Sequence, residues 1–492
     1  MWSKLLKAKS LKLNAILNTI KTVTSLLFPL ITFPYVSRIL LPEGTGKVNF
    51  ANSIVSYFGI IASLGIGTYA SREAAKIRDD KTKLAKLVKE ILSINIISTL
   101  IAYSLFFISL LTVSKFYEYR FLLCICSATI ILSTLGVDWL NSAMEDYAYI
   151  TIRTIIFQII SLTLIFLLIK TKDDFVKYAG ISVFQSVGAN ILNFFHSRKY
   201  VNYFLKTERL ELKKHIKPIF ILFGSSIAIS IFTIMDTSML GFLSTTTEVG
   251  YYSAASKLVR MIRNLFPAVF TVLFARFSYY NAHKDNESYM DLAKKTTNFI
   301  FCFSIPIVAG FILFSTPVIE LLCGSEYIPA TSSVIVLSPL VFISSCSGFL
   351  GGVLMITQGK EKQYLYTTAG ASIIDLILNF LLIPKMGAFG ASLATLITEV
   401  FIFIIYVTIS KNILVKINIG KPFFQYLVST AIMTIIIIFI AIRIENSLYR
   451  IVLGTFIGIA VYATCLQLMK NDYFITTKKD VLKKIFTKHL KN

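Results

Sequence analysis

The sequence predicts an all-α polytopic membrane protein, and three observations support this prediction. Of the 492 residues, 55% are hydrophobic and only 15% are charged, whereas soluble domains carry about 25% charged residues. Apolar runs recur from one end of the chain to the other, and each is long enough to cross a hydrocarbon core of about 30 Å. Basic residues fall mainly in every second connection between these runs, which is typical of a chain with a fixed orientation in a membrane.

Hydropathy divides the chain into about 14 transmembrane helices. In chain order they cover residues 13–40, 46–71, 91–113, 121–142, 148–169, 177–197, 217–243, 249–277, 296–322, 328–357, 363–384, 387–410, 422–442 and 448–469. The connections between them are short. The chain between these spans therefore has no room for a soluble ATPase, a glycosyltransferase or an extracellular catalytic domain.

The distribution of Lys and Arg predicts the orientation of these spans. The strongly basic connections 72–90 and 198–217 lie on one side of the membrane, together with the basic tail 470–492. Basic residues resist translocation and mark the cytoplasmic side, so we expect both termini in the cytoplasm. The net charge of +23 follows from these loops, and we expect no nucleic-acid partner.

Residue patterns for cofactor or metal chemistry are missing from the sequence. The six cysteines form no C-x-x-C pair and the four histidines form no H-E-x-x-H. The chain also lacks the G-x-x-x-x-G-K-[ST] loop that binds ATP phosphates. We therefore predict no metal, no cofactor and no enzymatic activity. A membrane-embedded polymerase or ligase would normally need a large outer loop, and the predicted outer loops are short.

Polar side chains form a stripe on the first predicted span. The stripe consists of Asn14, Asn18, Lys21 and Ser25. Residues three and four positions apart share one face of a helix. Arg38 lies at the outer end of the same span, and Asn49 lies in the second. An ionisable group at the centre of a spanning helix costs about 2.5–3.5 kcal/mol on insertion scales, so such groups normally face a cavity or a partner.

Cations are concentrated in the eighth predicted span. Lys257, Arg260 and Arg263 lie within two helical turns, and Arg153 lies in the fifth span. The guanidinium group is well suited to phosphate, so these residues predict a cavity for an anionic group. Two alternatives remain open. Arg38 and Lys257 reach an interface as snorkelling side chains, or Arg153 only marks the inner end of its span.

Three acidic residues also lie within apolar sequence. Asp236 is in the seventh span, Asp375 in the eleventh and Glu399 in the twelfth, and Asn379 extends the polar stripe of the eleventh. Either these carboxylates pair with the cations as structural partners, or they couple transport to H⁺ or Na⁺. Asn14, Asn18, Asn49 and Asn379 are candidates for hydrogen bonds to a polar substrate.

Two halves with weak self-similarity are predicted on either side of the middle basic connection. At an offset of 204 residues, Gly46, Ala51, Val55 and Arg72 correspond to Gly250, Ala255, Val259 and Arg276. Repeats of this kind are common in transporters. The predicted parts are an N-terminal six-helix bundle (1–197), a cytoplasmic basic linker (198–216), a C-terminal six-helix bundle (217–410), two additional transmembrane helices (411–469) and a basic cytoplasmic tail (470–492).

Four motifs carry a resemblance to a known family. They are PYVSRILLPEGTGKVNFANSIVSYFGIIASLGIGTYASREAAKIRDD (34–80), GVDWLNSAMEDYAYITIRTIIFQI (136–159), MDTSMLGFLSTTTEVGYYSAASKLVRM (235–261) and LLIPKMGAFGASLATLITE (381–399). With these motifs the chain resembles the polysaccharide flippase (Wzx-like) branch of the MOP exporter superfamily, which also contains the MATE drug antiporters and the lipid II flippases. The resemblance implies a MATE-like fold of two bundles with two extra C-terminal helices.

The resemblance also implies a function in the bacterial cytoplasmic membrane. The expected substrate is an oligosaccharide unit linked to undecaprenyl diphosphate, flipped for capsule, O-antigen or a related surface polysaccharide. Expected partners are membrane lipid and the polysaccharide polymerase and glycosyltransferases of the same pathway. Two alternatives stay open, a lipid II or teichoic-acid flippase and a MATE-type cation-coupled drug antiporter. A drug antiporter favours a cavity dominated by acids.

Overall fold

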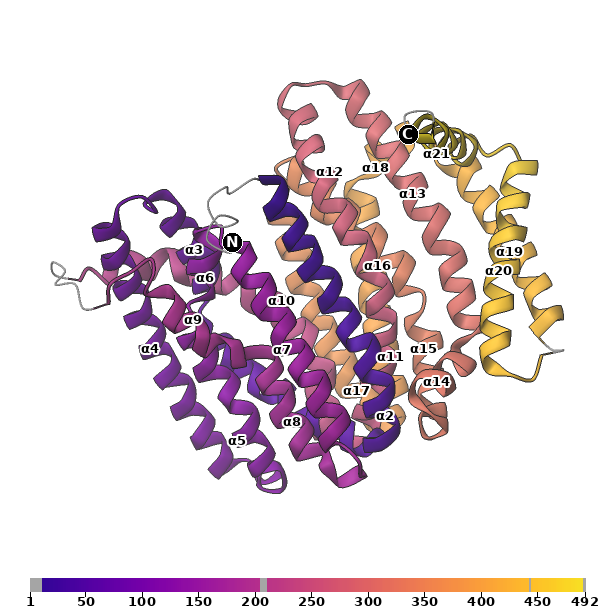
Figure 1. Cartoon of the computed structure of the whole chain (residues 1–492). Coiled ribbons are helices and arrows are strands. Elements are labelled where there is room, and N and C mark those ends of the chain that lie inside the picture. The colour runs from indigo at the N-terminus through magenta and orange to yellow at the C-terminus, as the bar shows by residue number, and fades with distance from the viewer. Residues whose placement is uncertain (1–10, 204–209, 442–443, 490–492) are drawn as a thin grey trace. The chain divides into compact units, whose positions relative to one another are not determined.

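The computed structural model describes residues 11–203, 210–441 and 444–489. Within these ranges the chain consists of helices and short connections, without a strand (Figure 1). It divides into two compact units, Met1–Gly250 and Tyr251–Asn492, each described by itself below. The predicted division of the chain into five parts stays a prediction.

The first unit is built around one long helix. Its elements are α2 (Leu11–Ser63), α3 (Ile66–Lys76), α4 (Lys81–Thr112), α5 (Ser114–Leu135), α6 (Asp138–Ala143), α7 (Tyr147–Leu168), η1 (Lys172–Asp174), α8 (Phe175–Val183), η2 (Phe184–Gly188), α9 (Ala189–Ser197), α10 (Lys213–Leu243) and the start of α11 (Thr246–Arg263). Helix α2 packs against α4, α5, α7, α8 and α10. It bends at Leu41, whose φ of 59° is not helical, because the following Pro42 disfavours helical geometry in the residue before it.

A close backbone crossing joins the middle of α2 to the start of α11. A Cβ atom at Gly46 would lie 1.7 Å from the carbonyl oxygen of Thr246, and one at Gly250 would lie 2.0 Å from that of Pro42. Only glycine permits this approach at both positions. The contact is reciprocal: the two glycines, Gly46 and Gly250, are 204 positions apart, which is the offset of the weak sequence repeat, and so are the residues they meet, Pro42 and Thr246.

The second unit contains a second kinked helix. After the remainder of α11 its elements are α12 (Leu265–Ala282), α13 (Asn286–Leu313), α14 (Ser315–Cys323), η3 (Ser325–Ala330), α15 (Thr331–Leu337), α16 (Leu340–Phe349), η4 (Leu350–Met355), α17 (Glu361–Ile409), α18 (Lys411–Ile417), α19 (Gly420–Ala441), α20 (Ser447–Leu468) and α21 (Asp472–His489). Helix α17 turns back on itself at Gly387, whose φ is 54°. Its two arms therefore carry polar residues that meet.

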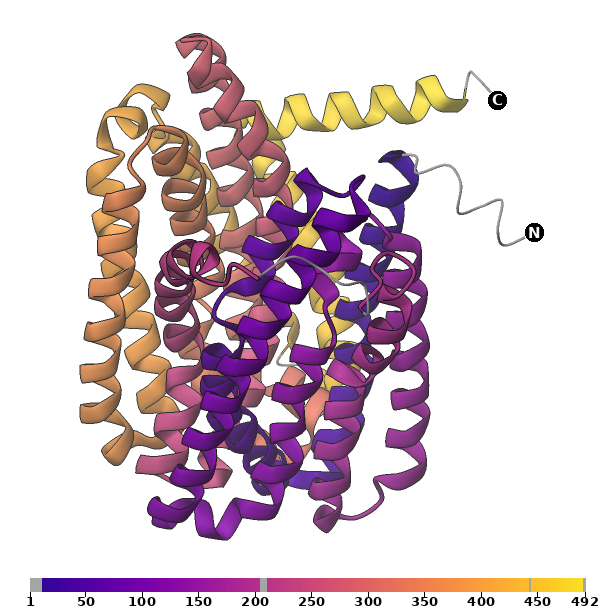
Figure 2. The ribbon, with the colours of Figure 1, turned by 90° about the vertical axis from the view of Figure 1, so that its left-hand side faces the viewer.

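The last helices of the second unit are fixed to α13 by a buried polar network. The Tyr426 hydroxyl of α19 donates to Oδ1 of Asn298 at 3.0 Å and to Oδ1 of Asn471 at 3.3 Å. The same Asn471 oxygen accepts the backbone N–H of Phe474 at 3.0 Å and so caps α21. Figure 2 shows α21 running across the direction of the other helices of its unit.

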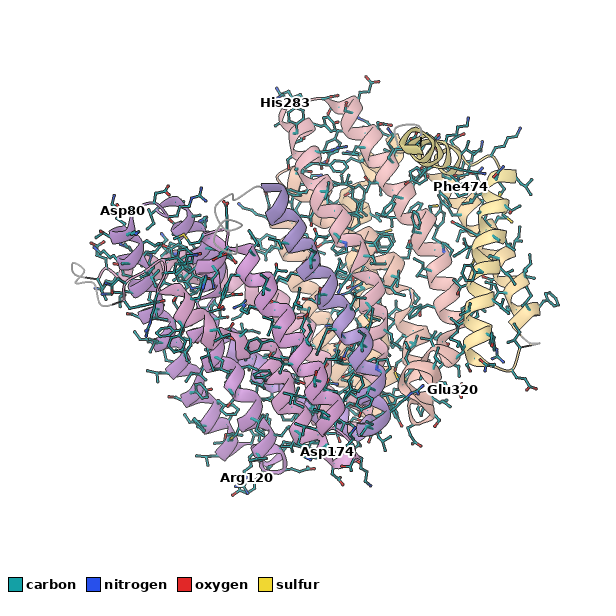
Figure 3. All side chains as sticks on the ribbon, in the orientation of Figure 1. Asp80, Arg120, Asp174, His283, Glu320 and Phe474 are labelled. Atoms are coloured by element: carbon teal, nitrogen blue, oxygen red, sulfur yellow. The ribbon has the colours of Figure 1, made fainter. Side chains whose placement is uncertain are left out.

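Connections alternate between the two ends of each unit. In the first unit Asp80 lies at the opposite end from Arg120 and Asp174, and in the second unit His283 and Phe474 lie opposite Glu320 (Figure 3). This alternation within each unit is what a chain that crosses a membrane repeatedly requires.

The described part of the chain contains nine helices that are long and apolar enough to cross a membrane. The number is ten if the bent pair Ser325–Leu337 and Leu340–Met355 counts as one span. Helix α2 covers two predicted spans and α17 covers two more, because each is kinked. The all-α multi-pass architecture is thus confirmed, whereas the count of fourteen stays a prediction.

Candidate functional site

An ion pair between a buried arginine and a half-exposed aspartate lies between α6 and α7 in the first unit. Arg153 donates from Nη2 to Oδ1 of Asp138 at 2.9 Å, and its side chain is only 7% exposed. Asn193 of α9 donates from Nδ2 to the same carboxylate oxygen at 3.1 Å. One carboxylate thus connects three helices. Because its guanidinium is both buried and paired, Arg153 is held in one position.

Unpaired polar atoms surround this ion pair. Asn141 is fully buried, and neither atom of its amide has a hydrogen-bond partner in the described part of the chain. The same holds for Nε and Nη1 of Arg153, Oδ1 of Asn193 and the hydroxyl of Tyr149. A buried polar group without a partner costs about 1–3 kcal/mol. Such a concentration of unpaired groups is typical of a site that receives additional polar atoms.

A histidine at the end of α9, His196, adjoins this cluster. The rings of His196 and Tyr149 stack with centroids 3.6 Å apart, and Nε2 of His196 lies 2.9 Å from Oδ2 of Asp146. Tyr200 donates a hydrogen bond to the same oxygen. Burial raises the pKa of the Asp146 carboxyl, but the hydrogen bonds from Tyr200 and His196 outweigh it and hold this pKa below its usual value.

A second histidine joins α3, α4 and α10. Nε2 of His215 lies 2.8 Å from Oε2 of Glu90, and its Nδ1 lies 2.7 Å from the hydroxyl of Tyr69. All three side chains are buried. Lys214 adds a contact of 3.2 Å to the Glu90 carboxylate. The arrangement fixes the start of α10 to the rest of the first unit.

The second unit contains an ion pair of looser geometry. Nη1 of Arg263, at the end of α11, lies 3.5 Å from Oε1 of Glu399 on α17. The same nitrogen donates to the Ser344 hydroxyl of α16 at 3.3 Å. The Arg263 side chain is 31% exposed and that of Glu399 10%. One turn earlier on α11, Arg260 is exposed and donates to the Ser256 hydroxyl at 3.2 Å.

The kink of α17 brings its two polar stripes together. Asn379 donates to Oδ2 of Asp375 at 3.1 Å, and Thr398 donates to Oδ1 of the same carboxylate at 3.2 Å. Asp375 and Asn379 are fully buried. Thr398 lies beyond the kink, directly before Glu399. The hydrogen bonds therefore fix both arms of the helix around one carboxylate.

The remaining predicted residues lie in different environments. Within the first unit, Lys21 and Asn49 are partly buried, Arg38 is exposed and Asp236 is buried. Within the second unit, Lys257 is partly buried. The side chains of Asn14 and Asn18 lie outside the described part of the chain. In that part, no group of three or more His, Cys, Asp or Glu residues is arranged to hold a metal ion.

Several polar residues of the first unit were missed by the sequence analysis. These are Asn141, Tyr149, Asn193, His196 and His215. The spacing of Asp138 and Asn141, three apart on one helix, was the only local signal. The histidines looked scattered because their carboxylate partners are far away in sequence, Asp146 by 50 positions and Glu90 by 125.

Two known proteins resemble the chain over 82% and 49% of its length. The Putative O-antigen transporter of Escherichia coli (strain K12) is 23% identical over 413 residues, which cover 82% of this chain and 97% of that protein. The Probable low-salt glycan biosynthesis flippase Agl15 of Haloferax volcanii is 22% identical over 241 residues, 49% of this chain and 51% of that protein. Both relatives carry names of transport proteins.

Solved structures resemble the chain in fold. A lipid II flippase MurJ in an inward closed conformation superposes with a TM-score of 0.69 at 19% identity, covering 93% of this chain and 99% of that one. An inward-facing multidrug resistance MATE family transporter of the MOP superfamily gives a TM-score of 0.59 at 16% identity, covering 80% of this chain and 95% of that one. These similarities confirm the predicted MATE-like fold.

The model of the family described as "Polysaccharide biosynthesis protein" matches residues 11–281, more than half of the chain, and the chain therefore belongs to that family.

Proposed function

We propose that this protein is a flippase that moves oligosaccharide units linked to undecaprenyl diphosphate across the bacterial cytoplasmic membrane. The units would serve capsule, O-antigen or related surface polysaccharide synthesis. The observation that carries the proposal is similarity to a putative O-antigen transporter along 97% of that protein's length. The family and the fold support it, and the sequence pattern places both termini in the cytoplasm.

The chemical task is to move a diphosphate and sugars past hydrocarbon. As first predicted, the diphosphate is neutralised by cations drawn from Lys21, Arg38, Arg153, Lys257, Arg260 and Arg263. Arg153 is already paired and buried, whereas the other five are at least partly exposed. Among these, Arg260 and Arg263 lie three residues apart on one helix and present two guanidinium groups together, so we assign the main contact with the diphosphate to them, and contacts with the sugars to asparagines such as Asn49.

The driving force does not require an ATP site. An inside-negative potential favours outward movement of an anion by roughly 2.3 kcal/mol per charge per 100 mV. Rocking of one helical bundle against another is the usual basis of alternating access in such transporters. Asp236, Asp375 and Glu399 remain the candidates for coupling to H⁺ or Na⁺. The protein would act without catalysis and pass its product to the polymerase of the same pathway.

A surface-glycan assay tests the proposal. It compares a deletion strain with strains that carry Arg260→Ala or, as a matched control on an exposed arginine of α12, Arg276→Ala, at equal membrane levels of the protein. We expect lost surface polysaccharide and accumulation of lipid-linked units in the deletion and Arg260→Ala strains only. Normal surface glycan in the deletion strain, without a redundant flippase, would overturn the proposal. Efflux of a cationic dye would then identify the drug antiporter.

A further inference from the structure

The ion pair between Arg263 and Glu399 has the geometry of an exchangeable contact. Its separation of 3.5 Å exceeds the 2.7–2.9 Å or so of a strong charge-assisted hydrogen bond. Nη1 of Arg263 divides its contacts between this carboxylate and the Ser344 hydroxyl at 3.3 Å. The arginine side chain is almost one-third exposed. A partner with better geometry and more charge can therefore replace the carboxylate.

The surroundings of the pair favour an anion as that partner. Arg260 lies three residues before Arg263 on α11 and is bound only through the Ser256 hydroxyl among its described hydrogen bonds. Residues three apart on a helix are neighbours on one face. The end of α11 thus presents two guanidinium groups against one carboxylate, and the local charge is positive even while Glu399 is in place.

We infer that Glu399 is a displaceable counter-ion that competes with the diphosphate of the substrate for Arg263. In the empty protein the carboxylate neutralises Arg263. A diphosphate displaces it, and the guanidinium groups of Arg260 and Arg263 then bind the phosphate oxygens. This inference rests on the proposed function and gives Glu399 a specific part in it.

The competition follows from charge. A diphosphate brings at least two negative charges, and its attraction to two guanidinium groups outweighs the loss of the single carboxylate contact. The release of Glu399 from Arg263 costs every anionic ligand the same free energy, so the carboxylate lowers the affinity of the site for anions without changing the preference between them.

Ligand titration of the purified full-length protein in detergent tests the inference. The probes are farnesyl diphosphate and short-chain dihexanoyl phosphatidylglycerol, and the variant is Glu399→Gln. Because a competing charge is removed, we expect farnesyl diphosphate to bind about three- to tenfold more tightly, the change that a partly exposed ion pair produces. Binding of phosphatidylglycerol should tighten by a similar factor, because the same contact is displaced. A purely structural glutamate would give weaker or unchanged binding of both.

Two further comparisons make the result specific. In an Arg263→Gln background, Glu399→Gln should have no effect on affinity, because the contact it competes for is gone. Glu361→Gln, an exposed glutamate on the same helix, should leave both affinities unchanged. If Glu399→Gln unfolds, Ser344→Ala, which removes a hydroxyl that hydrogen-bonds both Arg263 and Glu399, should loosen the pair and tighten farnesyl diphosphate by a smaller factor.

The outcomes separate the inference from the proposed function. If wild-type protein binds neither probe, the proposed diphosphate contact at Arg260 and Arg263 is wrong, and the inference about Glu399 is wrong with it. Wild-type protein that prefers farnesyl diphosphate, together with a Glu399→Gln variant that binds it no more tightly, would overturn the inference alone.

Discussion

The two units of the molecule each contain an arginine–carboxylate pair within apolar sequence, and the pairs differ in length and in which member is buried. Arg153 and Asp138 are 2.9 Å apart, with the arginine 7% and the carboxylate 50% exposed, and Asn193 also donates to this carboxylate. Arg263 and Glu399 are 3.5 Å apart, with the arginine 31% and the carboxylate 10% exposed. The arginine is therefore held in a buried position in the first unit, whereas in the second unit it is the more accessible member of a longer contact.

This difference shows why a cation in a spanning segment is not by itself a substrate contact. A buried and paired arginine has to give up its partner, at a cost of several kcal/mol, before it binds an anion. For a partly exposed arginine with a more distant partner, giving up that partner costs much less free energy. Burial and partner geometry thus decide which of the predicted cations are available to a diphosphate.

The largest effect is expected from breaking the tight pair. Asp138→Asn leaves the Arg153 guanidinium buried without its counter-charge, and we expect a loss of about 3 kcal/mol in the free energy of unfolding. Thermal unfolding in detergent measures it, with the exposed Asp173→Asn as control. An unfolding temperature equal to that of the control would show that the Arg153–Asp138 pair does not stabilise the fold. The contrast between the two pairs would then be wrong.

A smaller loss is expected at the third member of the same cluster. Asn193 is fully buried, and Asn193→Ala removes its hydrogen bond to Asp138 and leaves a small cavity. We expect a loss of about 1–2 kcal/mol in unfolding free energy. Combined with Asp138→Asn, the change should be less than additive because both substitutions act on one carboxylate. Strict additivity would mean that the two contacts are independent.

The loose pair should contribute little to stability. Glu399→Gln removes one charge of a contact that is partly exposed, and we expect a change below about 1 kcal/mol in unfolding free energy. The same thermal assay measures it beside Asp138→Asn. A loss as large as that of Asp138→Asn would place Glu399 among the structural partners and remove the contrast between the units.

The smallest effect concerns acid stability in the first unit. The pKa of Asp146 is lowered in the folded protein, so its contribution is present above the ordinary aspartate pKa of about 4 and is lost as the pH falls through the folded value. Unfolding of the wild type should therefore become easier below about pH 4. Asp146→Asn should show a flatter dependence in this range. An identical profile in both proteins would contradict the role of the contacts from His196 and Tyr200.

The fold was largely predictable from the sequence, and the pairings were not. Hydropathy alone predicted the multi-pass helical architecture, but it did not identify the kinks at Leu41 and Gly387 within α2 and α17. The sequence also grouped Arg260 with Arg263, because helical spacing is a local property. It left open whether Glu399 pairs with a cation, and the structure places it beside Arg263.

Long-range partners explain what the sequence could not supply. Asn193 lies 55 positions from Asp138, and His215 lies 125 positions from Glu90. No spacing rule connects such residues, since their contact depends on how α6, α9 and α10 pack within the first unit. Arg153 looked as available as Arg263 in the sequence, and only its burial distinguishes the two.

The most direct test of the account is a transport measurement with the purified protein. Vesicles that contain the full chain and a fluorescent undecaprenyl-diphosphate-linked sugar are treated with a reagent that modifies only the label in the outer leaflet. We expect wild-type protein to make the inner-leaflet label accessible, and Arg263→Gln to slow this step far more than the control Arg276→Gln. Accessibility equal to that of protein-free vesicles, under an imposed inside-negative potential, would contradict this expectation.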